Sequence, residues 1–237
     1  MIYITGDLHG DLERFKEKNM KQLKPGDTLL VCGDFGFIWD GSKQEKAALK
    51  YLSKLKFNIL FVEGLNENFD RLEEYPAEEY CGGMVHTIAP NIRHLCRGEI
   101  FTIEDTTIFA FGGGDPVEDL EEMTQQKAHA LRLPVLEQTD RALQHLGLHG
   151  DQVDVILTHD APGRIKQFMN LNEKDTALGF LHQFLQRVSE LADFQMWYFG
   201  RYHKDKAIPP RYRAMFKEVV PLKLPSQKEP SKGKNGF

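Results

Sequence analysis

Residues 2–10 read IYITGDLHG, an apolar run followed by a glycine-bounded turn that carries one acid and one imidazole. The run at residues 2–5 has the composition of a short buried strand, and the two glycines after it allow a tight exit. Side chains two positions apart in an extended backbone point to the same side, so Asp7 and His9 are expected to point together. The sequence therefore predicts a strand end with one oxygen and one nitrogen ligand; a capping Asp and a surface His are the alternative.

Two further apolar runs follow, at residues 28–32 and 58–62, and each ends in glycine or Gly-Asp. Between the three runs, residues 11–23 and 43–55 carry apolar side chains at helical spacing. Alternation of strand and helix is typical of parallel strands joined by right-handed crossovers. The first part of the chain is therefore expected to have an α/β fold.

The middle of the chain has a different pattern. Short strands joined by tight turns are expected at residues 84–88, 92–95, 100–103 and 107–111. This spacing favours an antiparallel meander, which would form a second sheet.

The α/β pattern returns after a charged stretch. Residues 115–150 are expected to form an exposed helical insert, with helical spacing through Leu136, Leu143 and Leu146. Strands at 153–157, 196–199 and 215–222, and a helix at 175–191, are expected to follow. Residues 1–222 then form one domain. Residues 223–237 form a flexible tail, because residues 225–237 are mostly Lys, Ser, Pro and Gly and have little apolar surface to bury.

Composition limits the class of protein. The chain has 237 residues, 41% of them hydrophobic, and a formal charge of −5, which argues against a surface dedicated to nucleic acid or anionic lipid. Its three cysteines lie far apart outside any CxxC pair, as expected for reduced thiols. We see no leader and no apolar run of about 20 residues that a membrane span needs. A cytoplasmic location is therefore expected.

Polar side chains follow several of the expected strands. Asp34 follows residues 28–32, His159 follows 153–157, and His203 follows 196–199. Ligands of α/β sheets gather at the carboxyl ends of strands, so these residues are expected to converge with Asp7 and His9. Asp and His together suit divalent cations such as Mn, Fe or Zn. By contrast, the other histidines, including His86, His94 and His182, show no partner spacing and are expected to be surface or internally satisfied residues.

Five segments resemble, in order and spacing, the five motifs of calcineurin-like metallophosphoesterases. They are GDLHG, GDFG, GLNEN, THDAP and GRYHKDK, at residues 6–10, 33–36, 64–68, 158–162 and 200–206. The resemblance covers about residues 1–222. It implies an α/β fold, a four-layer α/β/β/α sandwich of two mixed sheets flanked by helices, and metal-dependent hydrolysis of phosphate esters.

The resemblance also implies roles for individual residues. The first metal ion would take Asp7, His9 and His203, with Asp34 bridging to a second ion. The second ion would take His159, together with an Asn and a His that this chain lacks. The first set is complete here, so one ion is expected.

Three positions depart from the family pattern. Leu65 and Arg201 stand where the family has ligands of the second ion, and Asn66 stands where it has the catalytic His. A guanidinium about 4 Å from a cation repels it by about 4 kcal/mol per unit charge at an effective dielectric constant near 20. A normal second site is therefore not expected, and loss of a general acid costs about 10²- to 10⁴-fold in rate.

The departures leave two functions open. In one, the chain is a phosphoesterase of weakened or altered activity, in which Arg201 offers planar donors to a phosphate ester substrate in place of the second ion. Asn66 then occupies the catalytic position or replaces the missing Asn ligand, and Asn68 contacts substrate unless it caps a helix. In the other, the chain is an inactive pseudophosphoesterase that serves as a binding or regulatory module. Asp160 either orients His159 or is a turn residue.

Overall fold

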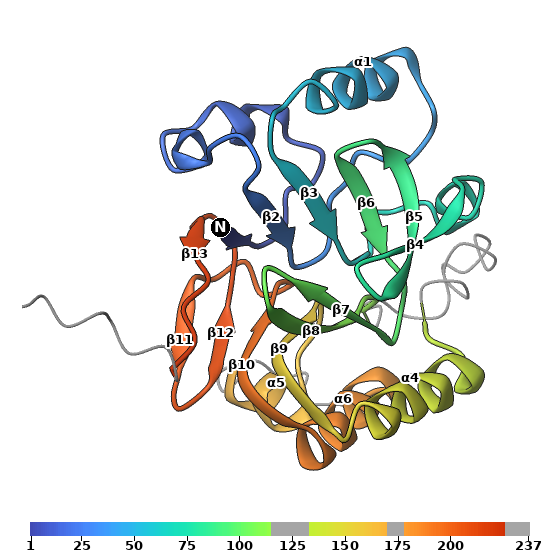
Figure 1. Cartoon of the computed structure of the whole chain (residues 1–237), viewed down its shortest axis with the longest axis vertical. Helices are drawn as coiled ribbons and strands as arrows, with labels where there is room; N and C mark the ends of the chain where they lie inside the picture. The colour runs from blue at the N-terminus through green and yellow to red at the C-terminus, as the bar shows by residue number, and fades with distance from the viewer. Residues whose placement is uncertain (115–132, 170–177, 226–237) are drawn as a thin grey trace, which may run out of the picture.

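The computed structural model describes residues 1–114, 133–169 and 178–225, which form two stacked β-sheets with helices on both outer sides (Figure 1). Three apolar layers hold this arrangement together. One lies between the sheets and includes Leu30, Leu60 and Leu157, and the other two lie between each sheet and its helices. Strands that are apolar on both faces, such as residues 28–31, are required for such a sandwich. The expected four-layer α/β/β/α fold is confirmed.

Within the described residues, the first sheet has seven strands in the order β13-β1-β2-β3-β6-β5-β4. Neighbours from β1 to β6 in this order run parallel, whereas β13, β5 and β4 pair antiparallel. The bounds are β1 Ile2–Thr5, β2 Thr28–Val31, β3 Asn58–Phe61, β4 Ala77–Tyr80, β5 Gly83–Ala89, β6 Ile92–Leu95 and β13 Val220–Pro221.

In the part of the chain that the structure describes, the second sheet has six strands in the order β11-β12-β10-β9-β8-β7, and β8, β9, β10 and β12 run parallel. Its edge strands, β7 and β11, pair antiparallel. The bounds are β7 Glu99–Ile103, β8 Thr106–Phe111, β9 Gln152–Thr158, β10 Asp193–Phe199, β11 Lys206–Ile208 and β12 Tyr212–Ala214.

Helices cover the outer face of each sheet (Figure 1). The first sheet is covered by the 3₁₀ turns η1 Leu12–Lys16 and η2 Met20–Gln22 and by α1 Lys43–Leu52 and α2 Phe69–Leu72. The second sheet is covered by α4 Leu136–Leu148, α5 Gly163–Met169 and α6 Phe180–Leu191. Among the described residues, no helix is long and apolar enough to cross a membrane.

The predicted meander at residues 84–111 is wrong, because its strands divide between the two sheets. β5 and β6 join the first sheet, where β6 lies parallel to β3, while β7 and β8 form a hairpin in the second. The chain passes from the first sheet to the second at Gly98, which has a φ of 78°. A side chain at this position would collide with Ala142 of α4. Local turn signals found the strands, but the pairing of β6 with β3 is a long-range contact.

Other expected elements differ in kind or extent. The helix expected at residues 11–23 is two 3₁₀ turns, whose first residues are capped by the side chains of Asp11 and Asn19. The strand expected at 215–222 is only the two-residue β13, because the carboxylate of Asp205 accepts hydrogen bonds from three successive backbone N–H groups at 216–218 and shapes that segment as a loop.

The described part of the expected insert is α4, and it is not fully exposed. Ala142 and Leu146 are buried against the second sheet, and His145 Nδ1 lies 2.9 Å from the carbonyl oxygen of Gly98. Residues 115–132 of this insert, 175–177 of the expected last helix and 226–237 of the expected tail lie outside the described residues. Within the tail, the described Leu224 is buried in the layer between the sheets.

Candidate metal centre

The carboxyl ends of β1 and β2 carry two loops that are bonded to each other. The backbone N–H groups of Leu8 and His9 both donate to the carbonyl oxygen of Asp34, at 2.9 and 2.8 Å. His9 and Asp34 adopt left-handed backbone conformations, with φ of 50° and 44°. Arg201 and His203, after β10, also have positive φ, at 64° and 47°. Positive φ is uncommon outside glycine, and its concentration here is typical of a functional site.

Three predicted ligands converge at one point. The ligand atoms of Asp7, His9 and His203 all lie within 4.8 Å of one another. Nε2 of His203 is 2.9 Å from Nε2 of His9 and 3.3 Å from Oδ2 of Asp7, and His9 Nε2 is 3.9 Å from the same carboxylate oxygen. Atoms bound to one ion at about 2.1 Å stand about 3.0 to 3.4 Å apart in octahedral or tetrahedral geometry. This spacing fits a divalent cation after small adjustments of the side chains.

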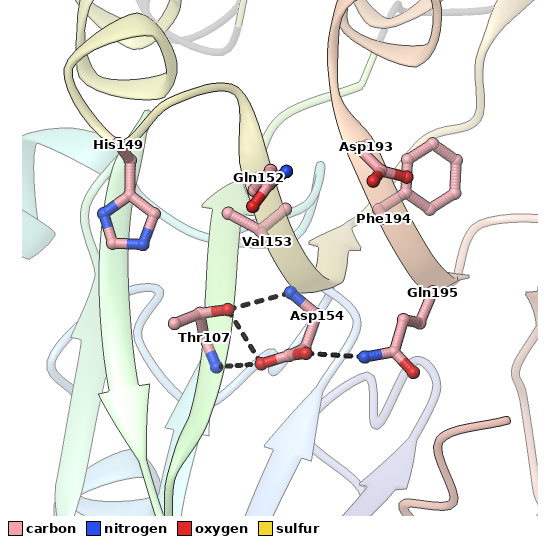
Figure 2. Close-up of a pocket in the computed structure, with 8 residues that line it drawn as sticks. All are labelled: Thr107, His149, Gln152, Val153, Asp154, Asp193, Phe194 and Gln195. Atoms are coloured by element: carbon pink, nitrogen blue, oxygen red, sulfur yellow. Dashed lines mark hydrogen bonds between the residues drawn. The ribbon is translucent and has the colours of Figure 1, made fainter. Parts of the chain in front are cut away.

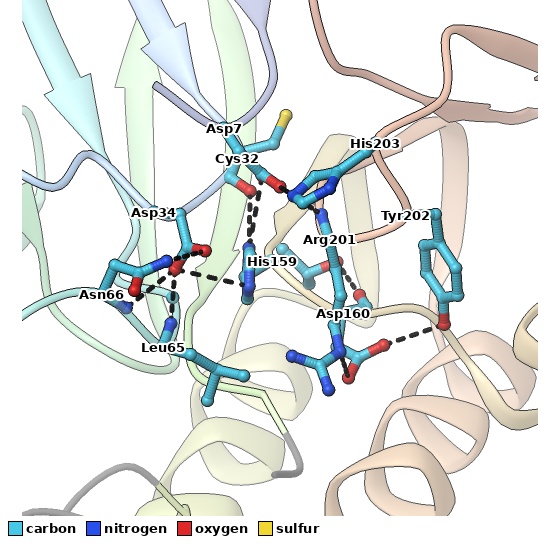
Figure 3. Close-up of polar contacts among 12 residues, drawn as sticks. Asp7, Cys32, Asp34, Leu65, Asn66, His159, Asp160, Arg201, Tyr202 and His203 are labelled. Carbon is cyan, nitrogen blue, oxygen red and sulfur yellow. Dashed lines mark hydrogen bonds and ion pairs between the residues drawn. The ribbon is translucent and has the colours of Figure 1, made fainter. Parts of the chain in front are cut away.

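Asp7 is buried, whereas His9 and His203 are exposed, so the centre opens to solvent on the imidazole side. The backbone N–H of Arg201 donates to both carboxylate oxygens of Asp7 at 3.1 Å and fixes its orientation (Figure 3). Asp7 also raises the pKa of His203, first through a direct hydrogen bond and then through its charge. A negative carboxylate beside two imidazoles is a suitable environment for a cation.

Asp34 and His159 form an adjoining pair on the other side of His9. Oδ2 of Asp34 is 3.6 Å from Nδ1 of His9, and Oδ1 of Asp34 is 3.6 Å from Nε2 of His159. Thus Asp34 faces the second ring nitrogen of His9, not the Nε2 atom that meets Asp7 and His203. Asp34 therefore lies next to the triad but outside the group of three ligand atoms, and its bridging of two ions stays a prediction.

His159 presents a buried nitrogen to this pair. Its Nδ1 lies 3.1 Å from the carbonyl oxygen of Cys32, an acceptor, so Nδ1 carries the proton and Nε2 keeps its lone pair. That Nε2 atom is buried and makes no hydrogen bond. Burial alone would lower the pKa of His159, but the charges of Asp34 and Asp7 outweigh it, and its pKa is raised. An unbonded nitrogen facing a carboxylate fits a position for a cation or a proton between them.

Leu65 and Arg201 lie beside His159. The three side chains surround one point next to Gly114. A Cβ atom built on this glycine would lie 3.1 Å from Nη1 of Arg201 and 3.3 Å from the side chains of both His159 and Leu65. An apolar group and a guanidinium therefore flank the buried His159. Neither group is a ligand for a cation.

Asn66 contacts the centre directly. Its Nδ2 donates to Oδ2 of Asp34 at 2.6 Å (Figure 3). The same Nδ2 lies 3.1 Å from Nδ1 of His9. The backbone N–H of Asn66 also donates to Oδ1 of Asp34 at 2.9 Å. The amide therefore lies against the expected bridging carboxylate, where it can donate to a bound phosphate oxygen or, with the amide turned over, offer its own oxygen.

Asn68 has a structural role in the fold. Its side-chain oxygen caps α2 by accepting from the N–H of Arg71 at 3.3 Å, and its Nδ2 donates to the carbonyl oxygen of Trp39 at 2.9 Å. Both the oxygen and the nitrogen of the Asn68 side chain thus already form hydrogen bonds within the protein. Contact of Asn68 with substrate stays a prediction.

Asp160, for which the sequence left open a role in orienting His159 or in a turn, is a buried acid at the centre of a polar cluster. Its Oδ2 lies 3.1 Å from Nε of Arg201, and its Oδ1 accepts from the hydroxyl of Tyr202 at 2.9 Å (Figure 3). Its Oδ2 also lies 3.2 Å from Nε2 of His182. Burial opposes ionisation, but His182 and Arg201 more than compensate, so the pKa of Asp160 lies well below its usual range. His182, whose partner the sequence did not identify, is therefore an internally satisfied residue of this cluster. In the sequence, only the THDAP segment, which contains Asp160, indicated this cluster.

Glu67 is a second buried acid beside the centre. Its carboxylate accepts from the N–H of Gly36 at 2.7 Å and of Gly64 at 2.6 Å, which ties two of the loops together. Burial raises the pKa of Glu67 to about 8, and the charge of Asp34 acts in the same direction. The acid holds the loop that presents Leu65 and Asn66.

A hollow of about 350 Å³ lies at the opposite, amino-terminal ends of β8, β9 and β10 (Figure 2). Its central acid, Asp154, accepts from the N–H and hydroxyl of Thr107, each at 2.8 Å, and from Nε2 of Gln195 at 2.6 Å. Because its own neighbours satisfy this carboxylate, the hollow is a less suitable ligand site than the carboxyl-terminal end of the sheets.

Comparison with known proteins agrees with this placement. The family of calcineurin-like phosphoesterases matches residues 1–195, which include Asp7, His9, Asp34 and His159 and end before His203. A comparison with curated proteins found no significant match. Because the match extends over most of its length, the chain belongs to the calcineurin-like phosphoesterase family.

Proposed function

We propose that this chain hydrolyses phosphate esters with one divalent metal ion, held by Asp7, His9 and His203 and bordered by Asp34. The observation that supports this most strongly is the convergence of three ligand atoms from two distant parts of the chain within 4.8 Å. Mn, Fe and Zn all suit a set of carboxylate and imidazole ligands, and we propose Mn as the first ion to test. The expected cytoplasmic location stays a prediction.

A divalent ion in this centre would polarise the phosphoryl group and lower the pKa of an attacking water molecule. The chain itself supplies donors around that ion. The amide of Asn66 reaches the edge of the centre at Asp34, and the guanidinium of Arg201 stands beside His159. Planar N–H donors suit phosphate oxygens, so these two residues would orient the ester and stabilise charge on it.

Arg201 is held in this position by Asp160. Its Nε lies 3.1 Å from Oδ2 of Asp160, which fixes the side chain, and its Nη1 lies near His159 and Leu65. A fixed positive charge at this place supports a mechanism with one metal ion, because it occupies the side where the family places a second cation. We propose that activity is altered accordingly.

The test is hydrolysis of p-nitrophenyl phosphate and bis(p-nitrophenyl) phosphate by metal-depleted protein with added Mn²⁺. We expect turnover that requires the metal and falls by more than about 100-fold in His203→Ala, since even indirect partners of a metal are worth about 10- to 100-fold. His149→Ala is the matched control, because His149 is an exposed imidazole that lines the hollow at the opposite ends of the strands. Equal turnover in both variants would refute the proposal.

A second candidate is a pseudophosphoesterase that binds a partner or regulates it without turnover. It is favoured by one observation: Leu65, Asn66 and Arg201, the three departures from the family pattern, all lie at the same side of the centre. The variant Leu65→Asn, Asn66→His, Arg201→His separates the two candidates. Activity in this triple variant but not in the parent supports the pseudoenzyme, whereas activity in the parent rules it out.

A further inference from the structure

We infer that His86, His94 and Cys96 form a second, separate metal site on the outer face of the first sheet, suited to Zn²⁺ or a similar thiophilic cation. The ligand atoms of these three residues all lie within 4.8 Å of one another. The two Nδ1 atoms are 3.1 Å apart, and Sγ of Cys96 is 3.8 Å from Nδ1 of His86. Tetrahedral zinc places two nitrogens about 3.3 Å apart and a nitrogen and a sulfur about 3.6 Å apart.

Strand pairing creates this cluster. β5 and β6 are antiparallel, and His86 lies directly opposite His94 in their register. Cys96 follows His94 by two positions, and its N–H donates to the carbonyl oxygen of Met84, which continues the same pairing. Residues opposite each other and two apart along a strand project from the same face. That face is the outer one, because the alternating Val85 and Leu95 are buried between the sheets.

His94 is held in the form that a metal ligand requires. Its Nε2 lies 2.7 Å from Oε2 of Glu63, and the other oxygen of this carboxylate is ion-paired with Arg97. The Glu63 carboxylate is an acceptor only, so Nε2 of His94 carries the proton and Nδ1 presents its lone pair toward His86. A carboxylate that orients the distal N–H of an imidazole is the usual outer partner of a metal-bound histidine.

A single hydrogen bond from His86 to His94 is the competing interpretation of the 3.1 Å distance. It accounts for the two rings but not for the thiol placed beside them. Binding a cation requires two changes: the proton of His86 moves to its Nε2, and Cys96 releases its thiol proton to solvent. His86 and Cys96 are half-buried, so water can reach both. Three ligands from the chain leave one position for water.

Cobalt tests the site, because a thiolate bound to Co²⁺ gives a charge-transfer absorption band. Metal-depleted, reduced wild-type protein is titrated with Co²⁺ and then with Zn²⁺. We expect a band that saturates by two Co²⁺ per chain, because the centre of Asp7, His9 and His203 also takes cobalt, and that disappears when Zn²⁺ displaces the cobalt. We expect it to be absent in Cys96→Ser and His86→Gln, and to remain in Cys81→Ser, whose exposed cysteine lies outside the cluster. His203→Ala should also keep the band, because its centre contains no thiol ligand.

A second measurement needs no substitution and so does not depend on the variants folding. Wild-type protein is alkylated with iodoacetamide in chelator or in Zn²⁺, and each cysteine is followed by peptide mass spectrometry. We expect Zn²⁺ to slow modification of Cys96 at least tenfold and to leave that of Cys81 unchanged. Equal rates at Cys96 with and without Zn²⁺, no band in the wild type, or a band that survives in Cys96→Ser would overturn the proposal.

Discussion

A Cβ atom built on Gly33 would lie only 2.2 Å from Nδ1 of His159. Glycine at this position, with a φ of 93°, lets the buried imidazole approach the end of β2 and reach the carbonyl oxygen of Cys32. His159 then extends toward Asp34 from the second sheet. The packing of a glycine against a histidine thus joins the two sheets at the centre.

Gly33→Ala is expected to destabilise the protein in two ways. Alanine is strained at a positive φ, and its Cβ atom would also force the imidazole of His159 to move, which should cost about 2 kcal/mol more. Gly26→Ala is the matched control: Gly26 has a φ of 87° with nothing within 4 Å of its Cβ position. It should cost only about 1 to 2 kcal/mol of backbone strain. Urea unfolding of both variants measures the difference, and equal free energies of unfolding would contradict the close packing of His159.

Arg201→Ala is expected to lower kcat for the phosphoester probes by about 10²- to 10³-fold, the usual effect of removing one fixed donor from a charged transition state. Arg201→Lys should recover part of this loss, because it keeps the charge but not the planar donors. Arg164→Ala, an exposed arginine on α5, serves as the control. A rise in kcat in Arg201→Ala would show that the guanidinium blocks the centre instead of assisting it.

Asp160→Asn is expected to lower the free energy of unfolding by about 3 kcal/mol, since it leaves Arg201 and His182 without a buried counter-charge. Tyr202→Phe removes only one neutral hydrogen bond to the same carboxylate and should cost about 1 kcal/mol. Both values can be measured by chemical denaturation. If Tyr202→Phe is less stable than Asp160→Asn, the charge of the Asp160 carboxylate does not hold the cluster together.

Acid should destabilise the metal-free protein through Glu63. Burial opposes ionisation of this carboxyl, but the charge of Arg97 and the hydrogen bond with His94 outweigh it, so its pKa falls from 4.5 to about 2. A lowered folded-state pKa stabilises the fold above pH 4.5, and this contribution is lost as the pH falls from about 4.5 to 2. The loss is about 3 kcal/mol in total.

Urea unfolding at several pH values in this range, in chelator, should reveal the loss. Glu63→Gln should be less stable at neutral pH and should show a shallower pH dependence. An unchanged slope in this variant would assign the acid sensitivity to other carboxyl groups.

The sequence predicted the parts of the fold that depend on local pattern. Strand ends such as Asp7 and Asp34 follow apolar runs and glycines, so their place at a carboxyl edge could be derived before the structure. The partition of residues 84–111 between two sheets could not, because β6 pairs with β3 across about thirty positions. Local turns do not encode such a contact.

The centre was predicted through its motifs, whereas its supporting residues were not. His182 reaches Asp160 only because α6 packs against the second sheet. His86 and His94 become neighbours only through the register of β5 and β6. In each case the partner is set by tertiary packing, and the spacing His94-x-Cys96 at the end of β6 was the one available local signal.

The most direct test of the metal centre is an anomalous difference map from crystals of the protein grown or soaked with Mn²⁺. We expect a peak about 2.1 to 2.3 Å from Oδ2 of Asp7 and from Nε2 of both His9 and His203, with Asp34 beside it. A clear peak elsewhere, with none among these three atoms, would contradict the assignment of the centre and the phosphoesterase function built on it.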